Sequence, residues 1–143
     1  MTLRTLCSAL AAIALSSAGA QEADKEVEAR KVALELAGAF SNDGFKIRDG
    51  HWAGELKQGD RAAVAVNLYA GNQYWFAVGS DGPAAKFSVQ LHDEDGKPLA
   101  GEDYQGEATA AAGFSPTISG QYFVSVAASE EGTGTYCLVY SYK

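Results

Sequence analysis

The segment Gly71-Asn72-Gln73-Tyr74-Trp75-Phe76-Ala77-Val78 is echoed 48 positions later by Ser119-Gly120-Gln121-Tyr122-Phe123-Val124-Ser125-Val126. In both copies a turn that contains glycine leads into Gln-Tyr, and large apolar side chains then occupy every second position. A period of two places these side chains on one face of a β-strand. A second apolar strand follows each copy, formed by Phe87, Val89 and Leu91 and, 49 positions on, by Tyr136, Leu138 and Tyr140. The repeat predicts two similar hairpins in the two halves of one β domain.

Short alternating segments fill the rest of the chain from residue 44 to residue 143. Residues 64–68 alternate clearly, residues 46–56 and 108–114 do so more weakly, and Gly, Asn, Asp and Pro separate the segments. About seven or eight short strands with such turns are typical of two antiparallel sheets packed face to face. The sequence therefore predicts an all-β domain at 44–143, an antiparallel two-sheet jelly-roll sandwich whose symmetry the repeat reflects.

The segment at 21–43 has a helical period instead. Its apolar residues recur at intervals of four, with two alanines beside them: Val32, Leu36, Phe40, Ala29 and Ala33. This spacing predicts one amphipathic helix over residues 22–40, which ends at the polar turn formers of residues 41–44. We expect the helix to pack on its own domain. The alternatives are that it covers a sheet edge or binds a partner.

Residues 1–20 have the layout of a cleavable secretory signal. Arg4 precedes an apolar run over residues 6–15, and small residues follow, ending in Ala18-Gly19-Ala20. The run is too short for a membrane-spanning helix, which needs roughly 20 apolar residues. We therefore expect a periplasmic or secreted protein that starts near Gln21 and is not inserted in a membrane after the signal is removed.

The charge and the cysteine count limit the partners and the covalent links. The chain has a net charge of −7, which becomes about −8 without Arg4, and its basic residues are scattered. Nucleic acid is therefore not an expected partner. Signal cleavage leaves Cys137 as the one cysteine, so no internal disulfide is expected. We interpret Cys137 as a half-buried strand residue; the alternatives are an intermolecular bridge and a reactive thiol.

The β region resembles the bacterial pre-peptidase C-terminal (PPC) domain family over about residues 54–142. The matching segments are Leu56-Lys57-Gln58-Gly59-Asp60, residues 68–76, residues 87–96, Ser119-Gly120-Gln121-Tyr122-Phe123-Val124-Ser125-Val126 and residues 134–139. Members of that family usually accompany secreted enzymes as noncatalytic accessory modules, and some bind calcium, substrate polymer or a partner domain. Where the family usually has Asp-x-Asp, this chain has Gly82-Pro83-Ala84-Ala85-Lys86, which departs from the family's calcium motif.

Catalytic motifs are missing from the sequence. No Gly-x-Ser-x-Gly occurs, and His51 and His92 lie 41 positions apart without a second ligand at i+2 or i+4. His92 ends a strand on its outward face, where an exposed imidazole is ordinary, and we interpret both histidines as structural or merely exposed. We therefore expect no catalytic residues and no zinc site.

An acidic region at residues 93–107 suggests two alternative functions beside a purely structural turn. It has six acids and one basic neighbour, Lys97: Asp93, Glu94, Asp95, Glu102, Asp103 and Glu107. We interpret residues 93–96 as a solvated turn whose acids cap backbone amides. The alternatives are a calcium-stabilised structural domain with ligands Asp93, Asp95, Glu102 and Asp103, and a small secreted hydrolase that uses carboxylates of this region. No other cofactor is expected.

Aromatic residues give the main candidate for a ligand site. Trp75 and Phe123 occupy the same place in the two copies and lie on the face opposite the predicted core. Such rings stack on sugars or hold a partner, and Trp52 and Tyr69 are expected neighbours; the alternative is that the helix covers one of the rings. The sequence thus favours a noncatalytic exported binding module whose partner is an envelope protein or a polysaccharide. The ligand and the oligomeric state stay open.

Overall fold

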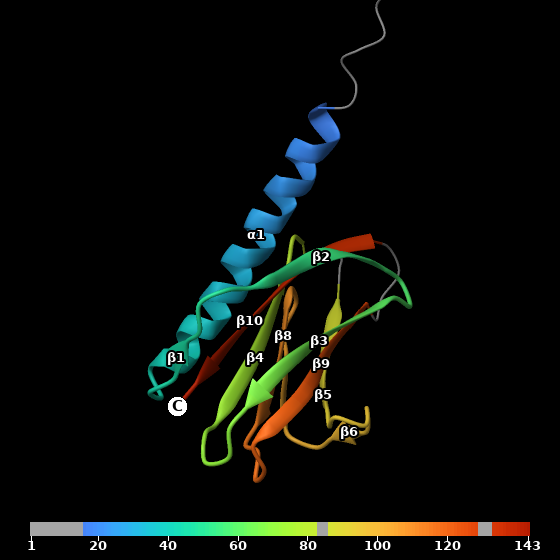
Figure 1. The fold of residues 1–143 in the computed structure, drawn as a ribbon. Helices are drawn as coiled ribbons and strands as arrows, with labels where there is room; N and C mark the ends of the chain where they lie inside the picture. The colour runs from blue at the N-terminus through green and yellow to red at the C-terminus, as the bar shows by residue number, and fades with distance from the viewer. Residues whose placement is uncertain (1–15, 83–85, 129–132) are drawn as a thin grey trace, which may run out of the picture.

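The computed structural model describes residues 16–82, 86–128 and 133–143, which form one helix beside a two-layered β-sandwich (Figure 1). The elements are α1 (Ser16–Ser41), β1 (Lys46–Ile47), β2 (Trp52–Lys57), β3 (Arg61–Leu68), β4 (Tyr74–Ser80), β5 (Phe87–His92), β6 (Pro98–Leu99), β7 (Glu102–Gln105), β8 (Thr109–Phe114), β9 (Gly120–Ala128) and β10 (Thr133–Tyr142). The predicted all-β sandwich with one N-terminal helix is therefore confirmed. The predicted signal lies mostly outside the described residues.

The two sheets are antiparallel throughout the described residues. The larger sheet has the order β1-β10-β4-β8-β7, and β2 also pairs with β10; the smaller sheet has the order β3-β9-β5-β6. The apolar side chains that alternate along β4, β5, β9 and β10 fill the space between the sheets. The fully buried ones include Phe76, Leu138, Val78, Val124 and Val126, and Leu68 of β3 is fully buried beside them.

The repeated segments do not form the predicted hairpins. In the first copy β4 belongs to the larger sheet and β5 to the smaller one, and in the second copy β9 and β10 are likewise divided between the sheets. The copies pair with each other instead, β4 with β10 and β5 with β9. The hairpin prediction was wrong because alternation reports which face of a strand is buried and says nothing of the neighbouring strand.

Helix α1 packs on the outer face of the larger sheet, as Figure 1 shows. The buried side of the helix consists of Ala29, Ala33 and Ala37, whereas the predicted stripe of Val32, Leu36 and Phe40 is only half-buried. The alanines contact Ala77, Cys137 and Val139 of the sheet. Small side chains on both surfaces let the two backbones approach closely, so the contact is centred on the alanines.

Gly79 of β4 shows how close this approach is. A Cβ atom at this position would lie 2.4 Å from the backbone nitrogen of Ala33 and 2.5 Å from the carbonyl oxygen of Ala29. Only glycine fits there, because the helix backbone occupies the space that any side chain would need. The helix ends as predicted, and Gly44 adopts a positive φ of 91° in the turn that follows. Within the described residues no helix is long and apolar enough to cross a membrane.

Candidate functional site

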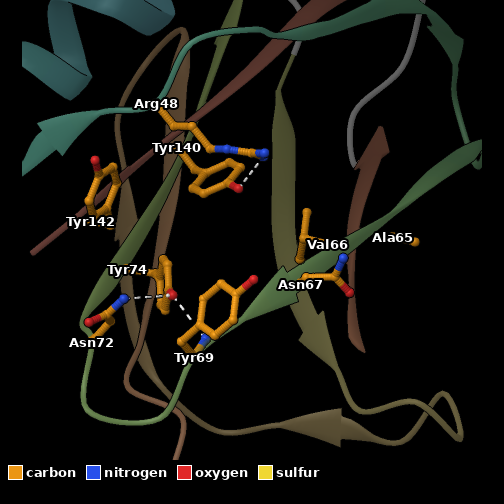
Figure 2. A pocket seen from close by; sticks show the side chains of 9 residues that line it. All are labelled: Arg48, Ala65, Val66, Asn67, Tyr69, Asn72, Tyr74, Tyr140 and Tyr142. Carbon is orange, nitrogen blue, oxygen red and sulfur yellow. Dashed lines mark hydrogen bonds between the residues drawn. The ribbon is translucent and has the colours of Figure 1, made fainter. Parts of the chain in front are cut away.

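A cleft of about 510 Å³ opens at the side of the sandwich, between β3 of the smaller sheet and β10 of the larger one (Figure 2). We call it the tyrosine cleft. Its lining residues are Arg48, Ala65, Val66, Asn67, Tyr69, Asn72, Tyr74, Tyr140 and Tyr142. They come from β3, the β3–β4 turn, β4, β10 and the segment after β1.

The strand pairing explains why the sandwich is open here. Strand β2 pairs with β10 as far as Leu138, and β1 pairs with β10 only at Ser141 and Tyr142. Between the two strands the edge of the larger sheet holds one backbone contact, in which the Arg48 N–H donates to the Tyr140 carbonyl at 2.9 Å. The edge strand is therefore interrupted beside Tyr140, and the side chain of Arg48 lies over the gap.

Two buried tyrosines form the floor of the tyrosine cleft. Tyr74 and Tyr140 point inward from neighbouring strands, and their ring centroids are 6.3 Å apart. The Tyr74 hydroxyl accepts hydrogen bonds from the Tyr69 backbone N–H at 2.9 Å and from Asn72 Nδ2 at 3.1 Å. These bonds hold the β3–β4 turn at one end of the cleft, so the floor and this wall are preorganised.

Arg48 brings a positive charge to the opposite side, as Figure 2 shows. Its guanidinium donates to the Tyr140 hydroxyl and lies 5.2 Å from the centroid of that ring. Burial raises the pKa of Tyr140, and the nearby Arg48 charge opposes this rise. The phenol is therefore protonated at neutral pH. Arg48 is exposed, and it is the one charged residue among the nine lining residues, all of which lie in the described part of the chain.

The rim carries two exposed rings, since Tyr69 is 60% and Tyr142 38% exposed. Aromatic faces, amides and a guanidinium suit a ligand with polar groups along an extended chain. None of the nine lining residues carries a carboxylate, an imidazole, a thiol or an aliphatic hydroxyl. The lining therefore offers surfaces for binding, and tyrosine is the one residue type in it that acts as a nucleophile or general base in enzymes.

The structure does not bring the four predicted aromatic residues together. Trp75 lies under the helix, where its ring stacks on Phe40 with a centroid distance of 4.5 Å and an interplanar angle of 6°. Phe123 is half-buried on the smaller sheet, and Trp52 stacks on Tyr140 at 6.1 Å beside the core. Only Tyr69 lines the tyrosine cleft, although Trp52 supports the far side of one of its floor residues.

Sequence reasoning missed Arg48, Tyr74, Tyr140 and Tyr142 as site residues. The alternation of β4 and β10 marks the three tyrosines as inward, which is correct, and inward residues are normally core. The missing information is the interruption of the sheet edge beside Tyr140. The one available signal is the number of hydroxyl-bearing rings on inward positions, because a buried phenol needs a hydrogen-bond partner and is often found near an opening.

The acids of residues 93–107 are divided between the two sheets. Asp93 Oδ1 accepts hydrogen bonds from the backbone N–H groups of Asp95 and Lys97, both at 2.9 Å, and Gly96 has a φ of 82°. These are the contacts of a capped turn. Glu102 and Asp103 instead lie on β7 of the larger sheet. Across the described ranges, no group of three or more His, Cys, Asp or Glu side chains is placed to hold a metal ion.

His92 is buried and hydrogen-bonded, so of the two interpretations, structural or exposed, it takes the structural one. Its side chain is 9% exposed, with Nε2 2.9 Å from Ser125 Oγ and Nδ1 3.3 Å from the Gly96 carbonyl oxygen. The turn after β5 folds back over the outward face of the strand and covers the ring. Parity assigns His92 to the correct face, but that face is not solvated at this position. His51, in the segment between β1 and β2, is exposed.

Cys137 is also more deeply buried than expected. It has no exposed surface and lies between the larger sheet and helix α1. Burial raises the pKa of its thiol to about 11, so the thiol is neutral at physiological pH. A covered, protonated thiol is a poor nucleophile. In this structure Cys137 is a packing residue. Cys7 lies outside the described residues.

The fold and the cleft define a small two-sheet sandwich with a lateral, tyrosine-lined opening. No protein-family model matches the chain, and no curated protein sequence matches it. Among solved structures, the chain is similar to the pre-peptidase C-terminal domain of a collagenase from Bacillus anthracis, with 24% sequence identity and a TM-score of 0.50. The similarity covers 64% of this chain and 87% of that domain. The chain thus has a PPC-like fold, which confirms the resemblance seen in the sequence at the level of the fold.

Proposed function

We propose that this protein is a noncatalytic binding module, exported to the periplasm or the cell exterior, that holds its ligand in the tyrosine cleft. The observation that carries the proposal is the cleft itself, which combines two exposed tyrosine rings with an exposed Arg48 over a preorganised floor. The signal-like residues 1–20 support export. The PPC-like fold supports an accessory role, since the resemblance implies noncatalytic modules.

The two alternatives from the sequence have less support. Both rely on acids of residues 93–107, and a calcium site needs about six to eight oxygens that converge on one point. Asp93 already accepts two backbone hydrogen bonds in its own turn, and Glu102 and Asp103 are exposed on an edge strand of the other sheet. A hydrolase needs two carboxylates facing a shared cleft. Asp93, Glu94 and Asp95 line a second, smaller cleft of about 240 Å³, but Asp93 is engaged by the backbone of its own turn and the other two are exposed. The tyrosine cleft has no carboxylate among its lining residues.

Ligand screening with matched variants tests the proposal. The full chain is screened on a glycan array and against a displayed library of random heptapeptides, and hits are measured again with Tyr69→Ala and Tyr142→Ala. Tyr104→Ala is the control, because Tyr104 is 46% exposed on β7 and does not line the cleft. Tyrosine is enriched among the interface residues whose truncation costs more than 1 kcal/mol, so each cleft variant should weaken binding roughly tenfold.

The control separates binding in the cleft from binding elsewhere. Tyr104→Ala should retain the affinity of the unaltered chain. The proposal fails if neither screen yields a ligand. It also fails if the two cleft variants bind every hit as tightly as Tyr104→Ala does.

A further inference from the structure

We infer that the ligand of the tyrosine cleft is an extended acidic peptide segment that pairs with the free edge of β3. This inference rests on the proposed function, because it takes the cleft as the binding site. It adds the chemical class of the ligand and the way in which the ligand is held.

Strand β3 is an edge strand. Within the described part of the chain it pairs only with β9, and the pairing runs without interruption from Arg61 to Leu68. An edge strand of eight residues presents a row of backbone N–H and C=O groups to the outside. The opposite side of β3 is therefore available for a further strand.

The backbone contacts at the start of β3 show which groups face outward. Gly59 N–H donates to the Ala128 carbonyl at 3.3 Å, and Ala128 N–H donates to the Asp60 carbonyl at 3.1 Å. This is a bulge in which Gly59, with a φ of 83°, and Asp60 lie opposite one residue of β9. Bonded and non-bonded pairs alternate along an antiparallel ladder, so Ala63, Ala65 and Asn67 direct their backbone groups to the free side.

This edge lacks the usual protection against pairing. Natural edge strands carry proline, inward-pointing charges or bulges that discourage a further strand. Residues 62–67 read Ala-Ala-Val-Ala-Val-Asn and contain no proline and no charge, and the ladder with β9 has no bulge there. Ala63 and Ala65 are exposed and small, so their side chains leave the neighbouring backbone accessible.

The free edge and the tyrosine cleft are the same place. Ala65 and Asn67 both belong to the cleft lining and direct backbone groups outward. Side chains of an added strand would alternate between the two faces of the sheet, so one set would point toward the larger sheet. There they meet Tyr142 and Arg48, both exposed at the opposite wall. The cleft thus provides side-chain contacts for a strand held by its backbone.

The charge of the cleft selects an acidic segment. Arg48 is the one charged residue among the nine lining residues, all of which the structure describes. A carboxylate on the ligand would accept charge-assisted hydrogen bonds from the guanidinium. A basic ligand would meet the same charge with like sign, so Arg48 discriminates between peptides more than it adds to affinity.

A peptide ligand accounts for both the free backbone edge of β3 and the aromatic, charged wall of the cleft. A glycan or a second copy of the chain accounts for only one of the two. A glycan can stack on Tyr69 and Tyr142 but has no regular row of donors and acceptors to match the backbone of β3. A second copy of the chain would match the edge by pairing β3 with β3, but residues 61–68 contain no acidic residue that could partner Arg48. Strand addition by a peptide uses the backbone for affinity and the pockets for specificity.

The test uses the full chain and peptides from the displayed heptapeptide library. The expected hits alternate β-branched residues and carry one Asp or Glu. The best hit is synthesised with a fluorescent label, its affinity is measured by fluorescence polarisation, and its backbone is N-methylated on one alternate set of residues at a time. Methylation of the set that pairs with β3 should weaken binding at least about tenfold, and methylation of the other set should change it less than about threefold.

Two protein variants test the same inference by independent affinity measurements. Ala65→Pro removes an N–H that faces the free edge and leaves the bonds to β9 in place, so the variant should fold and lose peptide affinity at least about tenfold. Arg48→Gln should abolish the preference for the acidic peptide over its amide analogue. If Ala65→Pro does not fold, as judged by its thermal melt, the N-methylated peptides decide the question.

The outcomes separate this inference from the proposed function. Equal losses for the two methylated peptides would overturn strand addition. Glycan binding without peptide binding would overturn the peptide ligand and leave the tyrosine cleft as a binding site. A concentration-dependent dimer that forms without peptide and is lost in Ala65→Pro would overturn the peptide ligand and identify a second copy of the chain as the occupant. The absence of any ligand would overturn both.

Discussion

The contact between helix α1 and the larger sheet gives the sharpest prediction, the effect of Gly79→Ala. The new Cβ would lie 2.4 Å from the Ala33 nitrogen and 2.5 Å from the Ala29 oxygen. An ordinary contact needs about 3.5 Å, so the helix must move away by about 1 Å and lose part of the dispersion contacts of its alanine face. Such overpacking costs about 1–3 kcal/mol. Alanine itself is favoured over glycine in a strand by about 0.5–1 kcal/mol, which leaves a net loss of about 1 kcal/mol.

The loss is measured as a change in Tm and in the exposure of Cys137. A net loss of about 1 kcal/mol should lower the Tm by roughly 4 °C for a domain of this size. Cys137 lies between the helix and the sheet, so a displaced helix should also raise the rate at which a chromogenic disulfide reagent attacks this thiol. The measurement is made in a Cys7→Ser background, because Cys7 and Cys137 are the only cysteines of the chain.

Gly38→Ala is the matched control. Gly38 is also a glycine of the helix–sheet region, but a Cβ there would have nothing within 4 Å. Alanine should stabilise the helix by about 0.5–1 kcal/mol and leave Cys137 protected. The explanation of the close approach is refuted if Gly79→Ala has the Tm and the thiol reactivity of the unaltered chain, or if the two glycine variants behave alike.

Three further predictions concern pH, the acidic turn and calcium. Burial raises the pKa of the Cys137 thiol from 9.0 to about 11, so between these pH values the folded chain keeps a proton that the unfolded chain loses. The free energy of unfolding should therefore fall as the pH rises through this window. Cys137→Ala should reduce the slope of Tm against pH there. Asp93→Ala removes the acceptor of the Asp95 and Lys97 backbone N–H groups and should lower the free energy of unfolding in urea by about 1–2 kcal/mol. Asp93→Asn keeps a side-chain oxygen and should cost less. Equal losses for the two variants would contradict the capping role of Asp93. Millimolar calcium should not change the Tm relative to chelator, and a rise of several degrees would restore the calcium-stabilised alternative.

Local patterns in the sequence are enough to predict the layers of this protein and the direction of most of its side chains. Alternation in β4, β5, β9 and β10 is a local property of an extended chain, and it correctly separates inward Phe76 and Val124 from outward Trp75 and Phe123. The end of the helix is equally local, since the turn after Ser41 and the positive φ of Gly44 depend on adjacent residues. The export signal remains a prediction.

Which faces meet and where the sandwich is open depend on long-range contacts that the folded chain alone reveals. The helix covers Trp75 because small residues, Ala33 and Gly79 among them, allow a close approach, and this depends on surfaces far apart in the chain. The tyrosine cleft exists because β1 and β2 share the edge of β10 and leave a gap beside Tyr140, opposite the free edge of β3. Periodicity identifies a buried face, but strand order and edge interruptions arise from long-range pairing, which no local pattern encodes.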